Sequence, residues 1–304
     1  MRTDNRRALM ITIAADTSST NINGSILKGV NGGFRGPFWP DLRYEYIPVP
    51  ETRMYQTEDG KWKWTGEYVE GGKETYESTL GYRLKSPLVS SIPFKLRKKL
   101  MNAAVHHDPR FRKGELTYGD GQSEGRGKQL AKLNPDDLLV FCPSLENPET
   151  GDRGRFIMGY FTVKEVFNFV GGEAEFKKKH ERDRSEIIDE YKNKNAHFSD
   201  AFARAWGWKN QGELQRAYLG GKKEDRDLVL VTGKENESGL LRKCIKITKP
   251  RDGKNFVMPT NLVESLGLKT PARPLAFDRG WKWIEGKTYF KSLTNLLEQG
   301  DGFL

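Results

Sequence analysis

The feature that most constrains the fold is a pair of apolar runs near the middle of the chain, DDLLVFCPSL (136–145) and GRFIMGYFTVKEVFNFV (154–170). Both runs are rich in β-branched and aromatic residues, which pack well on a pleated sheet. The polar segment ENPETGDR (146–153) between them contains proline and glycine, which favour turns. We therefore predict that the two runs form an antiparallel hairpin, the strongest local pairing in the sequence.

Shorter apolar runs predict further strands at residues 9–15, 42–50, 226–233 and 240–247. Helical patterns cover residues 126–133, 172–194, 199–208, 258–268 and 290–300. The clearest predicted helix is SSIPFKLRKKLMNAAVHHDP (90–109), which Ser90 or Ser91 can cap and Pro109 ends. Because strands outnumber helices in the middle of the chain and pair locally, we expect an α+β fold. Its centre is predicted to be a curved mixed sheet or a small barrel, with flanking helices.

The sequence contains no clear linker, so we expect one domain over residues 1–304. The charged aromatic stretch at 62–85 is a candidate insertion within it. No apolar run approaches the roughly 18 residues that a membrane-spanning helix needs. Cys142 and Cys244 both lie in apolar runs, as is typical of buried thiols in a reducing compartment. A cytoplasmic location is therefore expected.

The chain carries a formal net charge of +10, from 51 Lys and Arg against 41 Asp and Glu. Such a surplus favours polyanionic partners, because cations that neutralise phosphates release bound counterions. We expect contact with nucleic acid or a nucleotide, and a basic surface that serves only solubility is the alternative. In the predicted helix at 90–109, Lys95, Lys98 and Lys99 lie mostly off the apolar stripe. They are candidate contacts to a phosphate backbone, with a solvated face as the alternative.

The glycine-rich stretch HHDPRFRKGELTYGDGQSEGRGKQL (106–130) raises the question of a phosphate-binding loop. Gln122 and Gln129 stand where a Walker loop requires glycine and Ser or Thr, so that motif is excluded. A dinucleotide-binding fingerprint is excluded too, because no strand leads directly into a GxGxxG spacing. Arg126 and Lys128 open the next predicted helix. We expect either an anion contact there or a plain connecting loop.

Other polar residues are candidates for chemistry. Asp108 and Asp120 flank this loop, and Tyr118 lies beside the second carboxylate. A carboxylate next to a phenol can orient a nucleophile or a base edge, whereas ordinary turns are the alternative. His197 follows Asn195 at the exit of a predicted helix, where two directional hydrogen-bonding groups or a local cap would both explain the pattern.

The histidine spacing matches no metal motif. His106 and His107 end a predicted helix, where capping is the ordinary role of an imidazole. Together with His197 they could bind a metal only if the fold happened to bring them together. Neither HExxH nor a zinc-deaminase pattern occurs, so we predict no metal site. Asp16 and Ser18 follow the first predicted strand, where loops often carry ligand groups; polar capping of the loop is the alternative.

The order of these motifs resembles the nucleotide-modification-associated domain families, chiefly the third, which occur in prokaryotes and phages beside DNA-modification genes. It runs from DTSS (16–19) through PDLRYEYIPVPE (40–51), HHDPRF, TYGD, the central hairpin, NAHF (195–198) and DLVLVTG to a C-terminal LGL and Trp. The resemblance spans about residues 9–297 and implies an association with DNA-modification chemistry. The positions that match the polar motifs of the family are Asp16, Ser18, Pro48, Glu51, Asp108, Pro109, Tyr118, Asp120, Asn195 and His197.

The central hairpin also resembles, less closely, the strand pair of PUA and EVE barrel modules, which bind RNA or modified bases. A PUA-like element within the predicted sheet would follow from that similarity. It would favour a reader of modified bases over an enzyme.

Three functions remain open from the sequence. The first is a nucleotide- or base-modifying enzyme in which Asp108 or Asp120 is the general base and His197 is an acid or hydrogen-bonding group. Asp16 and Tyr118 would also belong to its catalytic site, and Arg126 and Lys128 would contact phosphates. Ser18, Glu51 and Asn195 would complete the site. The second is a non-catalytic, PUA-like reader of modified DNA or RNA, with Trp62, Trp64 or Tyr118 stacking on a base. The third is a structural, partner-binding protein. DNA is favoured over RNA, and the reaction and any cofactor stay open.

Overall fold

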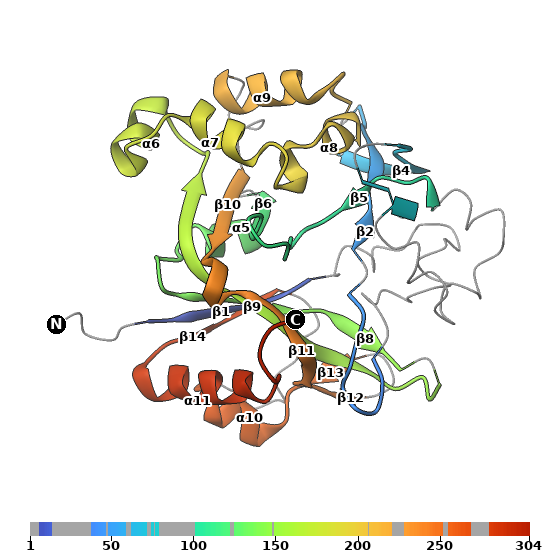
Figure 1. Ribbon diagram of the computed structural model, residues 1–304, viewed down its shortest axis with the longest axis vertical. Coiled ribbons are helices and arrows are strands. Elements are labelled where there is room, and N and C mark those ends of the chain that lie inside the picture. Colours follow the sequence, from blue (N-terminus) through green and yellow to red (C-terminus); the bar gives the residue numbers. More distant parts are fainter. Residues whose placement is uncertain are drawn as a thin grey trace.

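The largest element of the computed structural model is an eight-stranded mixed sheet (Figure 1). The structure describes residues 6–13, 38–46, 48–58, 62–71, 74–75, 77–78, 101–121, 125–147, 149–205, 207–220, 228–251, 255–268 and 280–304. The strands of the sheet are β1 (Ala8–Thr12), β6 (Thr117–Gly121), β7 (Leu138–Cys142), β8 (Ser144–Glu146), β9 (Arg153–Asn168), β10 (Leu228–Gly233), β11 (Gly239–Lys246) and β14 (Trp281–Ile284). Their order is β14-β1-β7-β9-β10-β6, and β8 and β11 also pair with β9.

The 16-residue strand β9 is the central strand of this sheet, because it pairs with β7, β8, β10 and β11. Strand β7 pairs antiparallel with it, from Leu138 opposite Thr162 to Phe141 opposite Gly159, which confirms the predicted hairpin. On its other edge β9 pairs with β11 over residues 156–160 and with β10 over residues 163–168. Strand β9 bends along its length and so pairs with several strands (Figure 1). Among the described strands, β14 and β6 lie at the two ends of this order. The predicted curved mixed sheet of an α+β fold is confirmed, and the alternative of a closed barrel is not realised.

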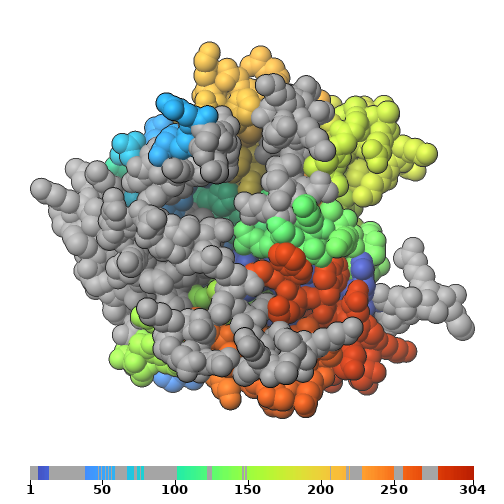
Figure 2. Space-filling view, turned by 180° about the vertical axis from the view of Figure 1, so that it is seen from behind, coloured from blue at the N-terminus to red at the C-terminus, as the bar shows by residue number. Residues whose placement is uncertain are grey.

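Both faces of the sheet are buried, because alternate residues of its strands face different cores. In β1, Met10 belongs to one core cluster and Leu9 to another. The first face is covered by α10 (Thr260–Ser265) and α11 (Lys287–Glu298), and the second is covered by α5 (Gly125–Leu130). Seen from behind, the C-terminal segments lie against the segment of α5 (Figure 2). The Nε1–H of Trp283 on β14 donates to Gln129 Oε1 over 2.9 Å at this contact.

A third core cluster lies where helices cover the far ends of β9 and β10 (Figure 1). The helices are α6 (Glu173–His180), α7 (Arg184–Tyr191), the 3-10 helix η3 (Ala196–Phe198), α8 (Asp200–Ala205) and α9 (Gln211–Gly220). The predicted single helix at 172–194 is wrong in one respect: it is broken into α6 and α7. The break is at Glu181, which adopts a left-handed backbone with φ of 56°. In the described part of the chain, no helix combines the length and the apolar character needed to cross a bilayer.

In the described residues, three two-stranded sheets accompany the main one. Strand β2 (Val49–Pro50) pairs with β5 (Val105–His106), β3 (Thr52–Gln56) pairs with β4 (Trp62–Tyr68), and β12 (Lys249–Arg251) pairs with β13 (Asn255–Val257). A short 3-10 helix, η5 (Glu235–Glu237), precedes β11.

Two sequence predictions are corrected in this region. The strand at 42–50 is wrong, because within the described residues only β2 at its end is a strand. The helix at 90–109 is wrong over its last part: Ala103 and Ala104 form bridges to Glu70 and Thr75, and β5 follows directly. Tertiary pairing therefore overrides the local helical preference here. Residues 81–100 lie outside the described residues.

Candidate functional site

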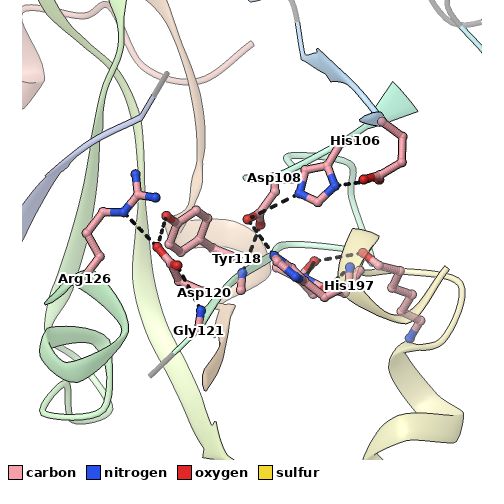
Figure 3. A network of polar contacts seen from close by, with 12 residues as sticks. His106, Asp108, Tyr118, Asp120, Gly121, Arg126 and His197 are labelled. Atoms are coloured by element: carbon pink, nitrogen blue, oxygen red, sulfur yellow. Dashed lines mark hydrogen bonds and ion pairs between the residues drawn. The ribbon is translucent and has the colours of Figure 1, made fainter. Parts of the chain in front are cut away.

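Strand β6, at one edge of the main sheet, separates two groups of polar side chains (Figure 3). Tyr118 and Asp120 point to one face of the strand, and Thr117 and Gly119 belong to the other, as strand alternation requires. Along the outer edge, Arg110 and Thr117 exchange two backbone hydrogen bonds of 2.8 and 3.2 Å. The segment that contains Asp108 therefore runs beside β6.

The first group centres on the carboxylate of Asp108. The backbone N–H of Gly119 donates to Asp108 Oδ1 over 2.9 Å, and His197 Nε2 lies 3.2 Å from Asp108 Oδ2. His106 Nε2 approaches the same Oδ2 to 3.9 Å. The Asp108 side chain is 9% exposed, against 14% for His106 and 15% for His197. We call His106, Asp108 and His197 the Asp108 cluster; it is largely buried, yet solvent reaches its imidazoles.

Glu51 supports this cluster from behind His106. Its Oε2 lies 2.8 Å from His106 Nδ1, and the Glu51 side chain is itself buried. The backbone holds the pair together, because the Glu51 N–H donates to the carbonyl of Ala104 and β2 pairs with β5. Along an extended backbone, side chains two positions apart lie on the same side. Those of His106 and Asp108 therefore lie side by side, and that of Val105 lies on the opposite side. The contact with Glu51 thereby leaves His106 Nε2 facing the Asp108 carboxylate.

Three neighbours fix the ring of His197 in η3. Asn195 Oδ1 accepts the backbone N–H of His197 over 3.0 Å, and Asn195 Nδ2 donates to Thr117 Oγ1 over 3.2 Å. A Cβ on Gly119 would lie only 2.7 Å from His197 Cδ2, so the missing side chain makes room for the imidazole. On another side the ring of Phe202 lies 4.7 Å from that of His197, centroid to centroid.

The electrostatics of the cluster follow from the carboxylates of Asp108 and Glu51. Burial alone would lower the pKa of His106, but Glu51 and Asp108 outweigh it and raise that pKa to about 10. Burial alone would raise the pKa of Asp108, but its contacts with His106 and His197 outweigh it and hold that pKa below its ordinary value. Both shifts favour an ionised Asp108 beside a protonated imidazole at position 106.

The pKa of His107, the next residue, is shifted in the opposite direction. Burial lowers the pKa of His107 to about 4, in spite of the Glu74 carboxylate 3.6 Å from its Nε2. The positive charge of Arg110, which two hydrogen bonds of 2.9 and 3.0 Å join to Glu74, acts in the same direction as burial. The two adjacent histidines thus face different surroundings, and only His106 belongs to the Asp108 cluster.

The second polar group, on the other face of β6, centres on Asp120. Asp120 Oδ2 accepts the hydroxyl of Tyr118 over 3.2 Å and lies 2.8 Å from Arg126 Nε. Asp120 Oδ1 accepts the backbone N–H of Gly121 over 2.9 Å, and Arg126 Nη1 donates to the carbonyl of Thr12 over 3.1 Å. This group ties α5 and β1 to β6. Asp108 and His197 therefore lie together, while Asp120, Tyr118 and Arg126 form a separate ion-paired group.

The remaining predicted site residues are placed as follows. Lys128 is exposed on α5, and Trp62 and Trp64 belong to β4. The residues that lie outside the described part of the chain are Asp16, Ser18, Lys95, Lys98 and Lys99. Their roles stay predictions.

His106 is the cluster member that the sequence analysis missed, because the segment was assigned to a helix in which an imidazole would cap the end. In extended backbone, residues two positions apart share a side, so the spacing His106-x-Asp108 brings both groups together. That spacing is the signal that would have identified the pair. Glu51 and Asn195, by contrast, were both predicted as site residues, and each contacts a histidine of the cluster.

A cavity of about 420 Å³ lies next to the cluster. Its lining includes Val105, His107, Asn195 and Arg204, but none of the three cluster residues. Val105 and His107 are the residues whose side chains alternate with those of His106 and Asp108. The cavity therefore borders the backbone that carries the cluster, on the side away from the His106 and Asp108 side chains.

Fold and site together define an α+β protein on an open mixed sheet, with a carboxylate–imidazole centre beside an edge strand. The chain belongs to the family described as nucleotide modification associated domain 3, whose family model matches residues 7–294. This confirms the resemblance noted in the sequence. Neither the curated proteins nor the solved structures include a significant match. The family description links the chain to nucleotide modification, while the polar centre rests on the geometry alone.

Proposed function

We propose that this chain is an enzyme that modifies a nucleotide or a base, and that the Asp108 cluster is its reactive centre. One observation carries the proposal: the fold brings together residues far apart in sequence. Glu51 and His106 are 55 positions apart, and Asp108 and His197 are 89 apart. Burying charged groups is costly, and perturbed titratable groups gather at functional sites. Such a convergence of buried titratable groups supports a reactive centre over a purely structural role.

The arrangement suits the chemistry of an active site. The N–H of Gly119 anchors Asp108, Asp108 orients His197, and the side chains of both histidines are partly exposed. A carboxylate between two imidazoles serves two kinds of chemistry in proteins, namely proton transfer and metal binding. In either case, removing the Asp108 carboxylate removes the group that contacts all the others.

The substrate class follows from the family and the charge. The family description concerns nucleotide modification, and the net charge of +10 favours a polyanion. We propose DNA as the first substrate to test, with RNA and free nucleotides next. Lys128, exposed on α5, is the better candidate phosphate contact, because Arg126 is paired with Asp120 over 2.8 Å.

The test is to express the full chain in a bacterial host, which supplies common co-substrates, and to analyse host nucleosides by mass spectrometry. DNA, RNA and the free nucleotide pool are digested separately. We expect a mass-shifted nucleoside with the wild type that disappears with Asp108→Asn and His197→Gln. The matched control, His107→Gln, replaces an adjacent histidine outside the cluster and should keep the product.

Identical nucleoside profiles for wild-type and empty hosts in all three fractions would refute the enzymatic proposal. If the purified protein then bound DNA tightly, with affinity falling steeply between about 50 and 200 mM salt, the reader of modified bases would take its place. If it bound no nucleic acid at all, the structural, partner-binding role would.

A further inference from the structure

We propose that the Asp108 cluster binds one divalent first-row transition metal through His106 Nε2, Asp108 Oδ2 and His197 Nε2. Glu51 would hold His106 in the binding orientation. This inference rests on the proposed function, because it names the cofactor of the same centre. It also revises the expectation from the histidine spacing that no metal site exists, since one ligand is a carboxylate that this spacing did not include.

The distances suit a metal. The three ligand atoms all lie within 4.8 Å of one another. Metal–ligand bonds of about 2.0–2.1 Å at angles between tetrahedral and octahedral place ligand atoms about 2.9–3.4 Å apart. His197 Nε2 and Asp108 Oδ2 already meet this condition at 3.2 Å. The separation of 3.9 Å between His106 Nε2 and Asp108 Oδ2 needs to close by only about half an ångström.

The donor set selects the class of metal. Two imidazole nitrogens and one carboxylate oxygen suit Zn²⁺, Fe²⁺, Co²⁺ or Mn²⁺, whereas Mg²⁺ and Ca²⁺ prefer all-oxygen surroundings. The charges agree as well. Glu51 and Asp108 are two carboxylates beside two imidazoles, and a dication would balance them.

The surroundings also resemble those of a built metal site. Metal-binding histidines usually donate their second N–H to a carboxylate or carbonyl, which fixes the ring. Glu51 Oε2 is such a partner for His106 Nδ1 at 2.8 Å. Asp108 is anchored likewise, because Gly119 N–H binds Oδ1 and leaves Oδ2 toward the imidazoles.

Three protein ligands leave at least one coordination position for water or substrate, which is the pattern of catalytic rather than structural sites. The partial exposure of both imidazoles, 14% for His106 and 15% for His197, gives a ligand access. A metal bound there would supply Lewis-acid activation of a water or substrate oxygen.

The test begins with the full chain, stripped with EDTA and dialysed, and titrated with Zn²⁺ and Co²⁺. We expect one equivalent to bind the wild type, and affinity to fall at least about 100-fold in His106→Gln and in His197→Gln. Glu51→Gln keeps all three ligands but loses the supporting carboxylate, so it should weaken binding by about 10–100-fold at unchanged stoichiometry. His107→Gln is the matched control and should bind like the wild type.

A readout that needs no variant guards against substitutions that fail to fold. X-ray absorption of the zinc-loaded wild type is expected to show two imidazole nitrogens and oxygen at about 2.0–2.1 Å. The inference is overturned if the spectrum lacks imidazole scattering, if the wild type binds neither metal below about 100 µM, or if folded His107→Gln loses as much affinity as His197→Gln.

The outcome for the metal is separable from the outcome for the function. One bound equivalent with unchanged host nucleosides would support the metal site and refute the modifying enzyme. Purified protein can also be added to a host extract that a chelating resin has freed of metal. A nucleoside product made there equally well by EDTA-stripped and zinc-loaded protein, yet not by His197→Gln, would support the enzyme and refute the metal.

Discussion

Replacing Gly119 by Ala tests whether the position of the His197 ring matters. The new Cβ would lie 2.7 Å from His197 Cδ2 and 3.2 Å from Leu228 Cδ1. Ordinary carbon contacts begin near 3.4 Å, so the imidazole has to move by about 0.7 Å. Its freedom is small, because Phe202 packs 4.7 Å from the ring and Asn195 holds the backbone N–H.

Two effects of opposite sign set the magnitude. Overpacking a well-filled site costs about 1–3 kcal/mol. Replacing glycine within a strand returns about 0.5–1 kcal/mol through lower entropy of the unfolded chain. We therefore expect the free energy of unfolding to fall by a net of at most about 2.5 kcal/mol, and by about 1 kcal/mol at the middle of the two ranges. The functional loss should be larger, since a misplacement near 1 Å can reduce the rate about 100-fold.

Urea denaturation and Co²⁺ titration measure the two effects on one sample, and host nucleosides report activity. Gly172→Ala is the control, because a Cβ there meets nothing within 4 Å and its φ of −83° suits alanine. A folded Gly119→Ala protein with wild-type metal affinity and wild-type product would refute the argument that the ring position defines the centre.

Three further predictions concern two substitutions and the reactivity of the cysteines. Arg126→Ala leaves the carboxylate of Asp120 buried without its cation, so urea denaturation should show a loss of about 3 kcal/mol; a loss below about 1 kcal/mol would mean that solvent already screens this pair. Asn195→Ala removes the cap of η3, which should cost about 1–2 kcal/mol in the same assay and weaken Co²⁺ binding, whereas unchanged binding would show that the cap does not position the cluster. Burial raises the pKa of the Cys244 thiol to about 12 and that of Cys142 still further, so at pH 8 a thiol reagent should label neither in the native protein and both in guanidinium. Rapid labelling of the folded protein would contradict their burial.

Sequence patterns predicted the centre of the fold well, because strongly apolar runs leave few alternatives. The hairpin of β7 and β9 follows from two such runs and one polar turn, and β1, β10 and β11 follow from the same kind of pattern. Sequence patterns did not predict the weakly apolar elements. The segment before Asp108 has good helix formers, yet pairing with residues more than 25 positions away sets its extended conformation.

The sequence identified most residues of the site, but not which of them lie together. Asp108, Asn195, His197 and Glu51 were all identified as polar residues at the ends of predicted elements, and the structure brings them together with His106. Which residues share a group depends on strand register. Asp108 binds the N–H of Gly119, whereas Asp120 is only one residue further along β6 and lies on the opposite face.

The location of the Asp108 cluster has a backbone cause. Arg110 and Thr117 exchange both backbone hydrogen bonds, so a continued antiparallel ladder would next join residue 108 to Gly119. At this position the carboxylate of Asp108 takes the place of its carbonyl as the acceptor of Gly119 N–H, while the Asp108 carbonyl accepts the hydroxyl of Tyr46 over 3.4 Å. The side chain thereby satisfies the edge strand and is held rigidly beside the space that Gly119 leaves for His197. An alanine at 108 would lose both the acceptor of the Gly119 N–H and the carboxylate beside the imidazoles. Asparagine would retain an acceptor for the edge strand. Asp108→Asn therefore separates the chemistry of the carboxylate from the stability of the sheet.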